Sequence, residues 1–157
     1  MISDRLEELG LQLPVIVAPK GSYVPFLVSR GHCFISGQLP PTTGVAESPG
    51  PYCGIVGANV SVETARDAAR HCALMILAQL GVAVDGDFDR VAQIVRLGGF
   101  VCATPDFNAH PQVVNGASDL MLELFGEAGR HTRAAVGVSS LPLGVCVEID
   151  AVVELKN

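Results

Sequence analysis

The sequence predicts an α+β domain in which two helices cover one face of a β-sheet. Apolar side chains occupy every odd position from Val145 to Leu155, which is the period of a strand buried on one side. Between Ser61 and Leu80, apolar residues recur at steps of three and four, which is typical of an amphipathic helix. The predicted order of elements is strand, strand, helix, strand, helix, strand, strand.

The N-terminal part is predicted to contain a short helix, an arm and a strand pair. Residues 3–9 form the helix, and residues 13–18, bracketed by prolines, form an edge strand or extended arm. Strands over 24–29 and 32–36 are joined by a tight turn at Arg30-Gly31. Residues 37–57 form a long loop, and a loop of that length is usually functional or interfacial.

The second half of the chain is predicted to alternate helices and strands. The helix over 61–80 is expected to stop at Gly81, and a strand over 91–101 to bulge or bend at Gly98-Gly99. A second helix runs to Phe125 with Pro111 in its first turn. A break at 141–144, where Pro142 and Gly144 favour a turn, separates the last two strands.

The strand over 133–139 carries the candidate functional residue. Alternation places Ala134, Val136 and Val138 on one face, expected to be the core face, and Arg133 on the other among small residues that leave its guanidinium over open space. Arginine can hold a planar carboxylate through two parallel hydrogen bonds. Glu148, on the non-core face of the last strand, could supply a base or a water-orienting acceptor nearby. The alternative is a strand arginine paired to a solvated glutamate.

Composition restricts the class of protein. A length of 157 residues predicts one domain, 1–157, and 49% hydrophobic with 17% charged residues argues against disorder. The formal net charge of −6 disfavours nucleic acid as a partner. The longest apolar run, residues 72–78, is too short to cross a membrane. Because the N-terminus carries Asp4, Glu7 and Glu8 instead of a basic signal segment, we expect a soluble cytoplasmic protein.

The sequence supports neither a metal site nor a disulfide framework. The five cysteines are odd in number and lack a CxxC pair, so free thiols are expected. The four histidines lie on four different elements without ligand spacing. His131 is an exception in one respect, since it lies two residues before Arg133 and could add a donor there. Ser36 and Cys146 have no His–Asp arrangement near them in the sequence, so nucleophilic catalysis is not expected.

The last strand also has apolar residues on its second face, where Cys146 and Val152 alternate with acidic residues. Two helices can cover only one side of a sheet. A partly apolar second face therefore indicates that another subunit covers it.

Three blocks of sequence follow one another along the chain: Gly21-Ser22-Tyr23, then ISGQLP from Ile35 to Pro40, and RAAVGVSSLP with VCVEIDA between Arg133 and Ala151. Together they resemble the signatures of the RidA (YjgF) family, also known as endoribonuclease L-PSP-like proteins, whose members are reactive imine/enamine deaminases. The resemblance covers nearly the whole chain. It implies a chorismate-mutase-like fold of the bacillus type, with a mixed sheet and two helices on one face, and a homotrimer with sites in the clefts between subunits.

The resemblance also implies a role for each matching residue. Arg133 would bind the substrate carboxylate and Glu148 would position the attacking water. The remaining pocket residues would be Tyr23, Ser36, Gly37, Asn115 and Ala135, with Ser36 and Gly37 contributing backbone groups. The implied reaction hydrolyses a 2-imino acid or its enamine to a 2-keto acid and ammonia, without a cofactor.

Two positions depart from the family pattern. Ala135 stands where deaminating members carry Cys or Ser, although its backbone could still bind ligand, and Asn115 is followed by Gly116 instead of an aromatic residue. Residues 44–57 and 125–133 match a divergent subgroup without an assigned activity. Three hypotheses follow: an imine deaminase, a catalytically silent module that binds small carboxylates, and an endoribonuclease, which the acidic charge and the lack of a basic groove disfavour.

Overall fold

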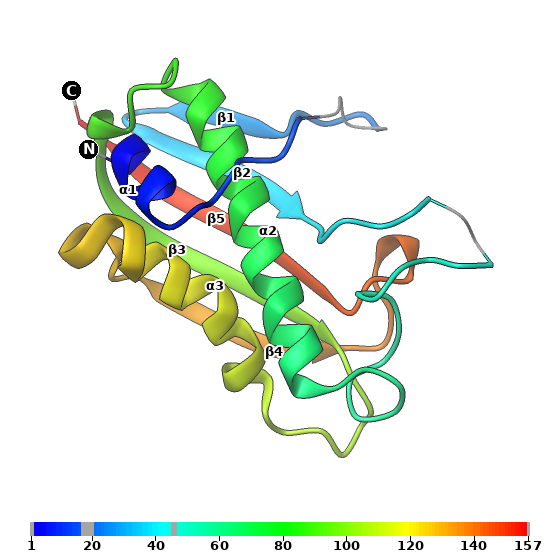
Figure 1. The fold of residues 1–157 in the computed structure, drawn as a ribbon. Coiled ribbons are helices and arrows are strands. Elements are labelled where there is room, and N and C mark those ends of the chain that lie inside the picture. Colours follow the sequence, from blue (N-terminus) through cyan, green and yellow to red (C-terminus); the bar gives the residue numbers. More distant parts are fainter. Residues whose placement is uncertain (1, 17–20, 45–46, 157) are drawn as a thin grey trace.

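The computed structural model describes residues 2–16, 21–44 and 47–156. A five-stranded sheet has the order β1-β2-β5-β3-β4, and α2 and α3 lie side by side across one of its faces (Figure 1). Only the β3–β4 pair is parallel. The bounds are α1 Ile2–Glu8, β1 Phe26–Ser29, β2 His32–Gln38, α2 Val62–Ala83, β3 Val91–Cys102, α3 His110–Phe125, β4 Thr132–Val138 and β5 Val147–Leu155, with short 3-10 turns at Phe88–Arg90, Gly126–Gly129 and Pro142–Gly144. The predicted α+β order of elements is confirmed.

The hairpin of β1 and β2 forms as predicted, because Arg30 and Gly31 both have positive φ angles, 49° and 75°, as a two-residue hairpin turn requires. Near its end β2 bulges against β5. Ile35 pairs with Ala151 and Gln38 with Ile149, so Ser36 and Gly37 together occupy the place of one residue. Residues 11–16 have no regular structure, and residues 17–18 of the predicted arm lie outside the described ranges.

Helix α2 begins as expected, with the Ser61 hydroxyl accepting a hydrogen bond from the Thr64 amide at 3.1 Å. Its predicted end at Gly81 is wrong, since the helix continues to Ala83. The residue after the C-cap, Asp85, has a left-handed φ of +55°, and Gly86 then donates its amide to the Gly81 carbonyl at 2.8 Å.

The predicted bulge at Gly98-Gly99 is also misplaced. The irregular pairing of β3 with β5 lies earlier, between Val91 and Arg96, whereas both glycines pair regularly with β4 and β5. A Cβ atom at Gly99 would lie 2.5 Å from Cγ2 of Val114. Glycine is therefore present to admit α3 close to the sheet and not to bend the strand.

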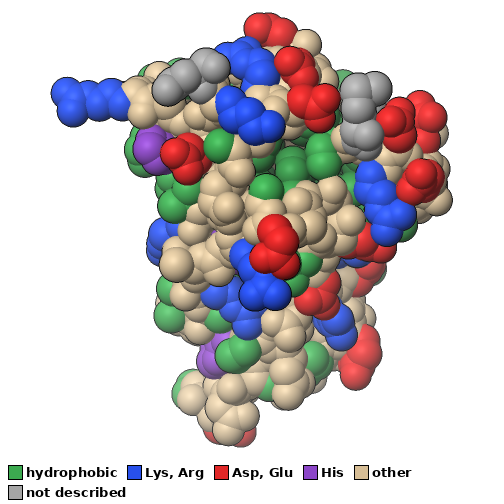
Figure 2. Space-filling model, turned by 90° about the vertical axis from the view of Figure 1, so that its left-hand side faces the viewer, with side chains coloured by type: hydrophobic (Ala, Val, Ile, Leu, Met, Phe, Trp, Pro, Cys, Tyr) green, Lys and Arg blue, Asp and Glu red, His purple; other side chains and the backbone are tan. Residues whose placement is uncertain are grey.

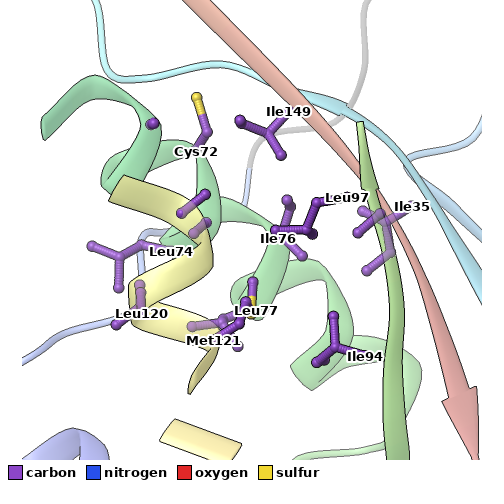
Figure 3. Close-up of a cluster of buried hydrophobic side chains, with 14 of the residues drawn as sticks. Ile35, Cys72, Leu74, Ile76, Leu77, Ile94, Leu97, Leu120, Met121 and Ile149 are labelled. Atoms are coloured by element: carbon purple, nitrogen blue, oxygen red, sulfur yellow. The ribbon is translucent and has the colours of Figure 1, made fainter. Parts of the chain in front are cut away.

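The core fills the space between the sheet and the two helices. Figure 3 shows Ile35, Ile94, Leu97 and Ile149 of the sheet meeting Cys72, Ile76 and Leu77 of α2 and Leu120 and Met121 of α3. All odd-numbered side chains from Val145 to Leu155 are buried, which confirms the predicted core face of β5. All five cysteines are free thiols, four of them buried. Within the described ranges, no helix is both long enough and apolar enough to cross a bilayer.

The predicted orientation of β4 is wrong. Arg133, Ala135 and Gly137 face α3, whereas Val136, with 44% of its surface exposed, faces away from the helices. A Cβ atom at Gly137 would lie 2.6 Å from Nε2 of His110, so the small residues mark the covered face. Packing of α3 over an edge strand requires small side chains beneath it, which the alternation of apolar residues alone does not reveal.

Candidate functional site

Arg133 is held between the first residues of β4 and helix α3. Its Nη1 atom donates to Oδ1 of Asn115 at 2.7 Å and to Oγ of Ser118 at 3.0 Å, and its Nη2 atom donates to the carbonyl of Pro111 at 3.3 Å. The guanidinium is thus half-buried, not standing over open space as predicted from its small neighbours. A cavity of about 490 Å³ borders it.

The guanidinium keeps two donors for a ligand. Three of its five N–H groups are used by the contacts to α3. Within the described part of the chain, the Nε–H and one Nη2–H group have no partner. These two nitrogens form one edge of the planar guanidinium, and such an edge can take a carboxylate through two parallel bonds. The geometry therefore suits capture of a planar anion.

Ser118 and His131 extend the hydrogen-bond network of Arg133. Nε2 of His131 lies 2.9 Å from Oγ of Ser118, and Nδ1 of His131 lies 2.6 Å from the carbonyl oxygen of Gly129. The sequence flagged His131 as a possible added donor near Arg133, but it contacts Arg133 only through Ser118. No sequence signal indicated Ser118, because the serine and the histidine belong to different elements 13 residues apart.

Glu148 lies on the other face of the sheet. Its carboxylate packs over the Cα atom of Gly37, where any side chain would collide with it. Burial, and secondly the nearby Asp150, raises the pKa of Glu148 above its ordinary value. Asp150 is itself paired with Arg96 at 3.1 Å. A carboxyl group with a raised pKa can hold and release a proton nearer neutral pH than a solvated glutamate can.

Pairing across the sheet shows that Arg133 and Glu148 do not meet within one chain. Phe100 of β3 pairs with both Glu148 and Val136, so these three side chains share one face. Arg133 is three residues from Val136 along β4 and therefore faces the opposite way. The expectation that Glu148 stands beside Arg133 is wrong for a single protomer.

Some of the other predicted pocket residues lie near Arg133 and others lie near Glu148. Asn115 lies with Arg133, whereas Ala135 faces α3 and packs against the core. Gly37 lies with Glu148 and also borders a cavity of about 630 Å³ that is lined by Tyr23, which is 57% exposed.

The backbone at Ser36 is already occupied. Its amide donates to the Pro25 carbonyl at 2.9 Å and its hydroxyl to the Val24 carbonyl at 2.8 Å. Ser36 therefore shapes the bulge beside Glu148 and holds β2 against the residues that precede β1. Across residues 2–16, 21–44 and 47–156, no three His, Cys, Asp or Glu side chains converge as metal ligands do.

Comparison with known proteins identifies the family. A family model described as "YjgF/chorismate mutase-like, putative endoribonuclease" matches residues 3–155. The chain belongs to the RidA (YjgF) family. Its chorismate-mutase-like fold, predicted from the three sequence blocks, is confirmed by this match and by the mixed sheet with two helices on one face.

Members of the family similar to this chain come from distant organisms. Protein TCP17 of Trypanosoma cruzi is 44% identical over 157 residues, covering 99% of this chain and 95% of that protein. A crystallised protein of unknown function from Agrobacterium tumefaciens is 44% identical, with a TM-score of 0.86 and coverage of 99% and 94%. A "putative endoribonuclease" of Shewanella oneidensis is 35% identical, with a TM-score of 0.90 and coverage of 99% of both chains. None of these three descriptions names a deaminase, so the activity of this RidA-family chain has to be argued from its site.

Proposed function

We propose that the protein is a deaminase that hydrolyses 2-imino acids or their enamines, and that its sites form between the subunits of a homotrimer. The observation that carries the proposal is the Arg133 guanidinium, fixed by α3 with one edge open for a small carboxylate. The carboxylate would be the group through which the site recognises its ligand. Tyr23, Ser36, Gly37, Asn115 and Ala135 are proposed to surround it.

The reaction needs a positioned water and a proton carrier. Water adds to the imine carbon next to the carboxylate, forming a carbon–oxygen bond, while the imine nitrogen takes up a proton. The new hydroxyl group then gives up its proton and nitrogen gains one, so that the carbon–nitrogen bond breaks, ammonia leaves, and the carbonyl group of a 2-keto acid remains. In this proposal Glu148 takes the proton from the water and passes it to nitrogen, a role that its raised pKa supports. Because a protonated imine carbon is already electrophilic, the chain's own groups suffice without a cofactor.

The positions of Arg133 and Glu148 support a site shared between subunits. Since they point to opposite faces of the sheet, a pocket that uses both must take Glu148 from a second copy. The face without helices has the surface for such contact, as Leu27 and Phe34 pair across β1 and β2 there with 59% and 47% of their surfaces exposed. Exposed apolar patches of this kind mark interaction sites. Light scattering should give three times 16.4 kDa, whereas a stable monomer would refute the shared site.

The proposed activity is tested by supplying the unstable substrate as it forms. An amino-acid dehydratase or oxidase would generate 2-iminobutyrate, and a carbonyl trap such as semicarbazide would report how much imine survives. The purified protein should speed formation of 2-ketobutyrate and reduce the trapped fraction. An unchanged trapped fraction, with folded protein in excess, would exclude deaminase activity on this imine.

A silent binding module is the second candidate, and the separation of Arg133 from Glu148 favours it. A single protomer has the arginine edge that can bind a carboxylate, but its Glu148 lies on the other face of the sheet. This candidate predicts carboxylate binding without imine hydrolysis. RNA cleavage has less support, because Figure 2 shows acidic side chains interspersed among the basic ones on the side it presents, and the net charge is −6.

A further inference from the structure

We infer that His131 and Ser118 are positioning residues that hold the Arg133 guanidinium with its ligand-binding edge turned outward. Their contacts form one continuous chain from the Gly129 carbonyl through His131 and Ser118 to Nη1 of Arg133, with distances of 2.6, 2.9 and 3.0 Å. Ser118 is 7% exposed, His131 is half-buried, and both line the cavity of about 490 Å³ that borders Arg133. The inference rests on the proposed function only where it concerns ligand affinity.

The direction of each hydrogen bond follows from the partners. A carbonyl oxygen only accepts, so Nδ1 of His131 must carry the proton that bonds to Gly129. In the neutral ring Nε2 then has a lone pair and accepts from the Ser118 hydroxyl. This leaves the Ser118 oxygen free to accept from Arg133. The histidine therefore sets the orientation of the serine hydroxyl, and the serine sets one contact of the arginine.

The link matters because an unrestrained arginine has many rotamers. Asn115 fixes one hydrogen of Nη1 and Ser118 fixes the other. With both in place, turning of the guanidinium plane is restrained, and the Nε and Nη2 edge is left for a ligand in the cavity that Arg133 borders. Order that exists before binding lowers the entropic cost of capturing the ligand.

A serine 2.9 Å from a histidine nitrogen also resembles a nucleophile and its base. Two features favour positioning instead. The second nitrogen of His131 meets a backbone carbonyl and not the carboxylate that orients the histidine of a catalytic triad. The Ser118 oxygen already accepts from Arg133 and bonds to His131, so it is held by two partners within the protein and is poorly placed to attack a substrate carbon.

The test compares variants that break the link with one that preserves it. His131→Phe keeps the ring but removes the acceptor, Ser118→Ala removes the hydroxyl, and His131→Gln offers an amide oxygen near the position of Nε2. The matched control is Thr64→Ala, on α2, which removes a hydroxyl group that accepts a hydrogen bond from Ser61 at 3.0 Å. Two quantities are measured for each: the ¹⁵N relaxation of the Arg133 Nε–H group, and the affinity for 2-ketobutyrate by calorimetry.

We expect His131→Phe and Ser118→Ala each to loosen the Arg133 Nε–H group and to weaken 2-ketobutyrate binding by about threefold to tenfold, the worth of one hydrogen bond. Because both act through one chain of contacts, the double variant should be no weaker than either single one. His131→Gln should restore most of the order and affinity, and Thr64→Ala should change neither.

Three results would overturn the inference. One is an equally ordered Nε–H group in the wild type, His131→Phe and Ser118→Ala proteins. Another is full additivity in the double variant, and the third is covalent labelling of Ser118 by a fluorophosphonate. The relaxation measurement needs no ligand, so a wild type that binds no carboxylate would refute the proposed function while the positioning role was still decided. Tight binding without imine hydrolysis would refute the deaminase alone.

Discussion

Replacing Arg133 by alanine should sharply weaken binding of small carboxylates such as 2-ketobutyrate. Its neighbours on the strand, Ala134 and Ala135, have no polar side chain that could replace the guanidinium fork. The change also leaves Asn115 and Ser118 without their partner, so the variant should lose about 1–3 kcal/mol of stability while remaining folded.

The expected size follows from the two free N–H groups. A hydrogen bond to a charged group contributes about 1.5–3 kcal/mol. Arg133 is only half-buried, so the lower end applies. Loss of a single bond then weakens binding about tenfold, and loss of both about a hundredfold. Arg133→Lys keeps the charge but loses the planar edge, so its affinity should fall between the wild type and alanine variants.

Arg130→Ala provides the matched control, measured by the same calorimetric titration. Arg130 borders the same cavity, its removal changes the net charge equally, and its exposed side chain pairs with Glu127 at 3.2 Å. Removing such an exposed pair should change affinity less than about threefold. Equal losses for Arg133→Ala and Arg130→Ala would show that general charge, not the guanidinium edge, binds the ligand. Unchanged affinity in Arg133→Ala would refute carboxylate capture altogether.

Three further changes have defined outcomes. Glu148→Gln should lower imine turnover, measured as 2-keto acid release, while leaving 2-ketobutyrate affinity equal or higher, because a negative charge is lost. Because the pKa of Glu148 is raised, the folded protein binds this proton more tightly than the unfolded chain does, and protonation contributes to the free energy of unfolding. That contribution is complete below the ordinary pKa of 4.5 and is lost as the pH rises through the raised pKa. The Tm of the wild type should therefore fall relative to that of Glu148→Gln over this pH range, and a constant difference in Tm would contradict the raised pKa. Gly116→Ala should lower the Tm and reduce the free energy of unfolding by about 1–3 kcal/mol, because the added Cβ atom would collide with the Arg66 carbonyl where α2 and α3 cross. An unchanged Tm would disprove that close approach of the two helices.

Elements whose signals are local could be predicted from the sequence. The period of two in β5 and the apolar steps of three and four in α2 were sufficient to place a strand and a helix. Glycines were harder to interpret, because a glycine that ends a helix and one that admits a neighbour look alike in a sequence. Gly81 and Gly99 are of the second kind, close to Phe88 and to Val114 respectively.

The assembly of the site depended on contacts that sequence spacing does not encode. Alternation in β4 identifies two faces of the strand but does not show which of them α3 covers. Arg133 was therefore expected on the open face, whereas it lies on the face that α3 covers. Ser118 came to Arg133 only through the packing of α3 on β4. By contrast, the Arg133–Asn115 contact was expected, since the family resemblance placed both residues in one pocket.

Recovery of activity by mixing two inactive variants tests the shared site most directly. Arg133→Ala and Glu148→Gln protein are unfolded together in equal amounts, refolded, and assayed for 2-iminobutyrate breakdown. In a ring of three random protomers, about one interface in four joins an intact Arg133 to an intact Glu148 of the neighbour, so about a quarter of the wild-type rate should return. If both residues served a site within one protomer, every protomer in the mixture would be defective. A rate no greater than that of the two variants kept apart would contradict the inter-subunit deaminase.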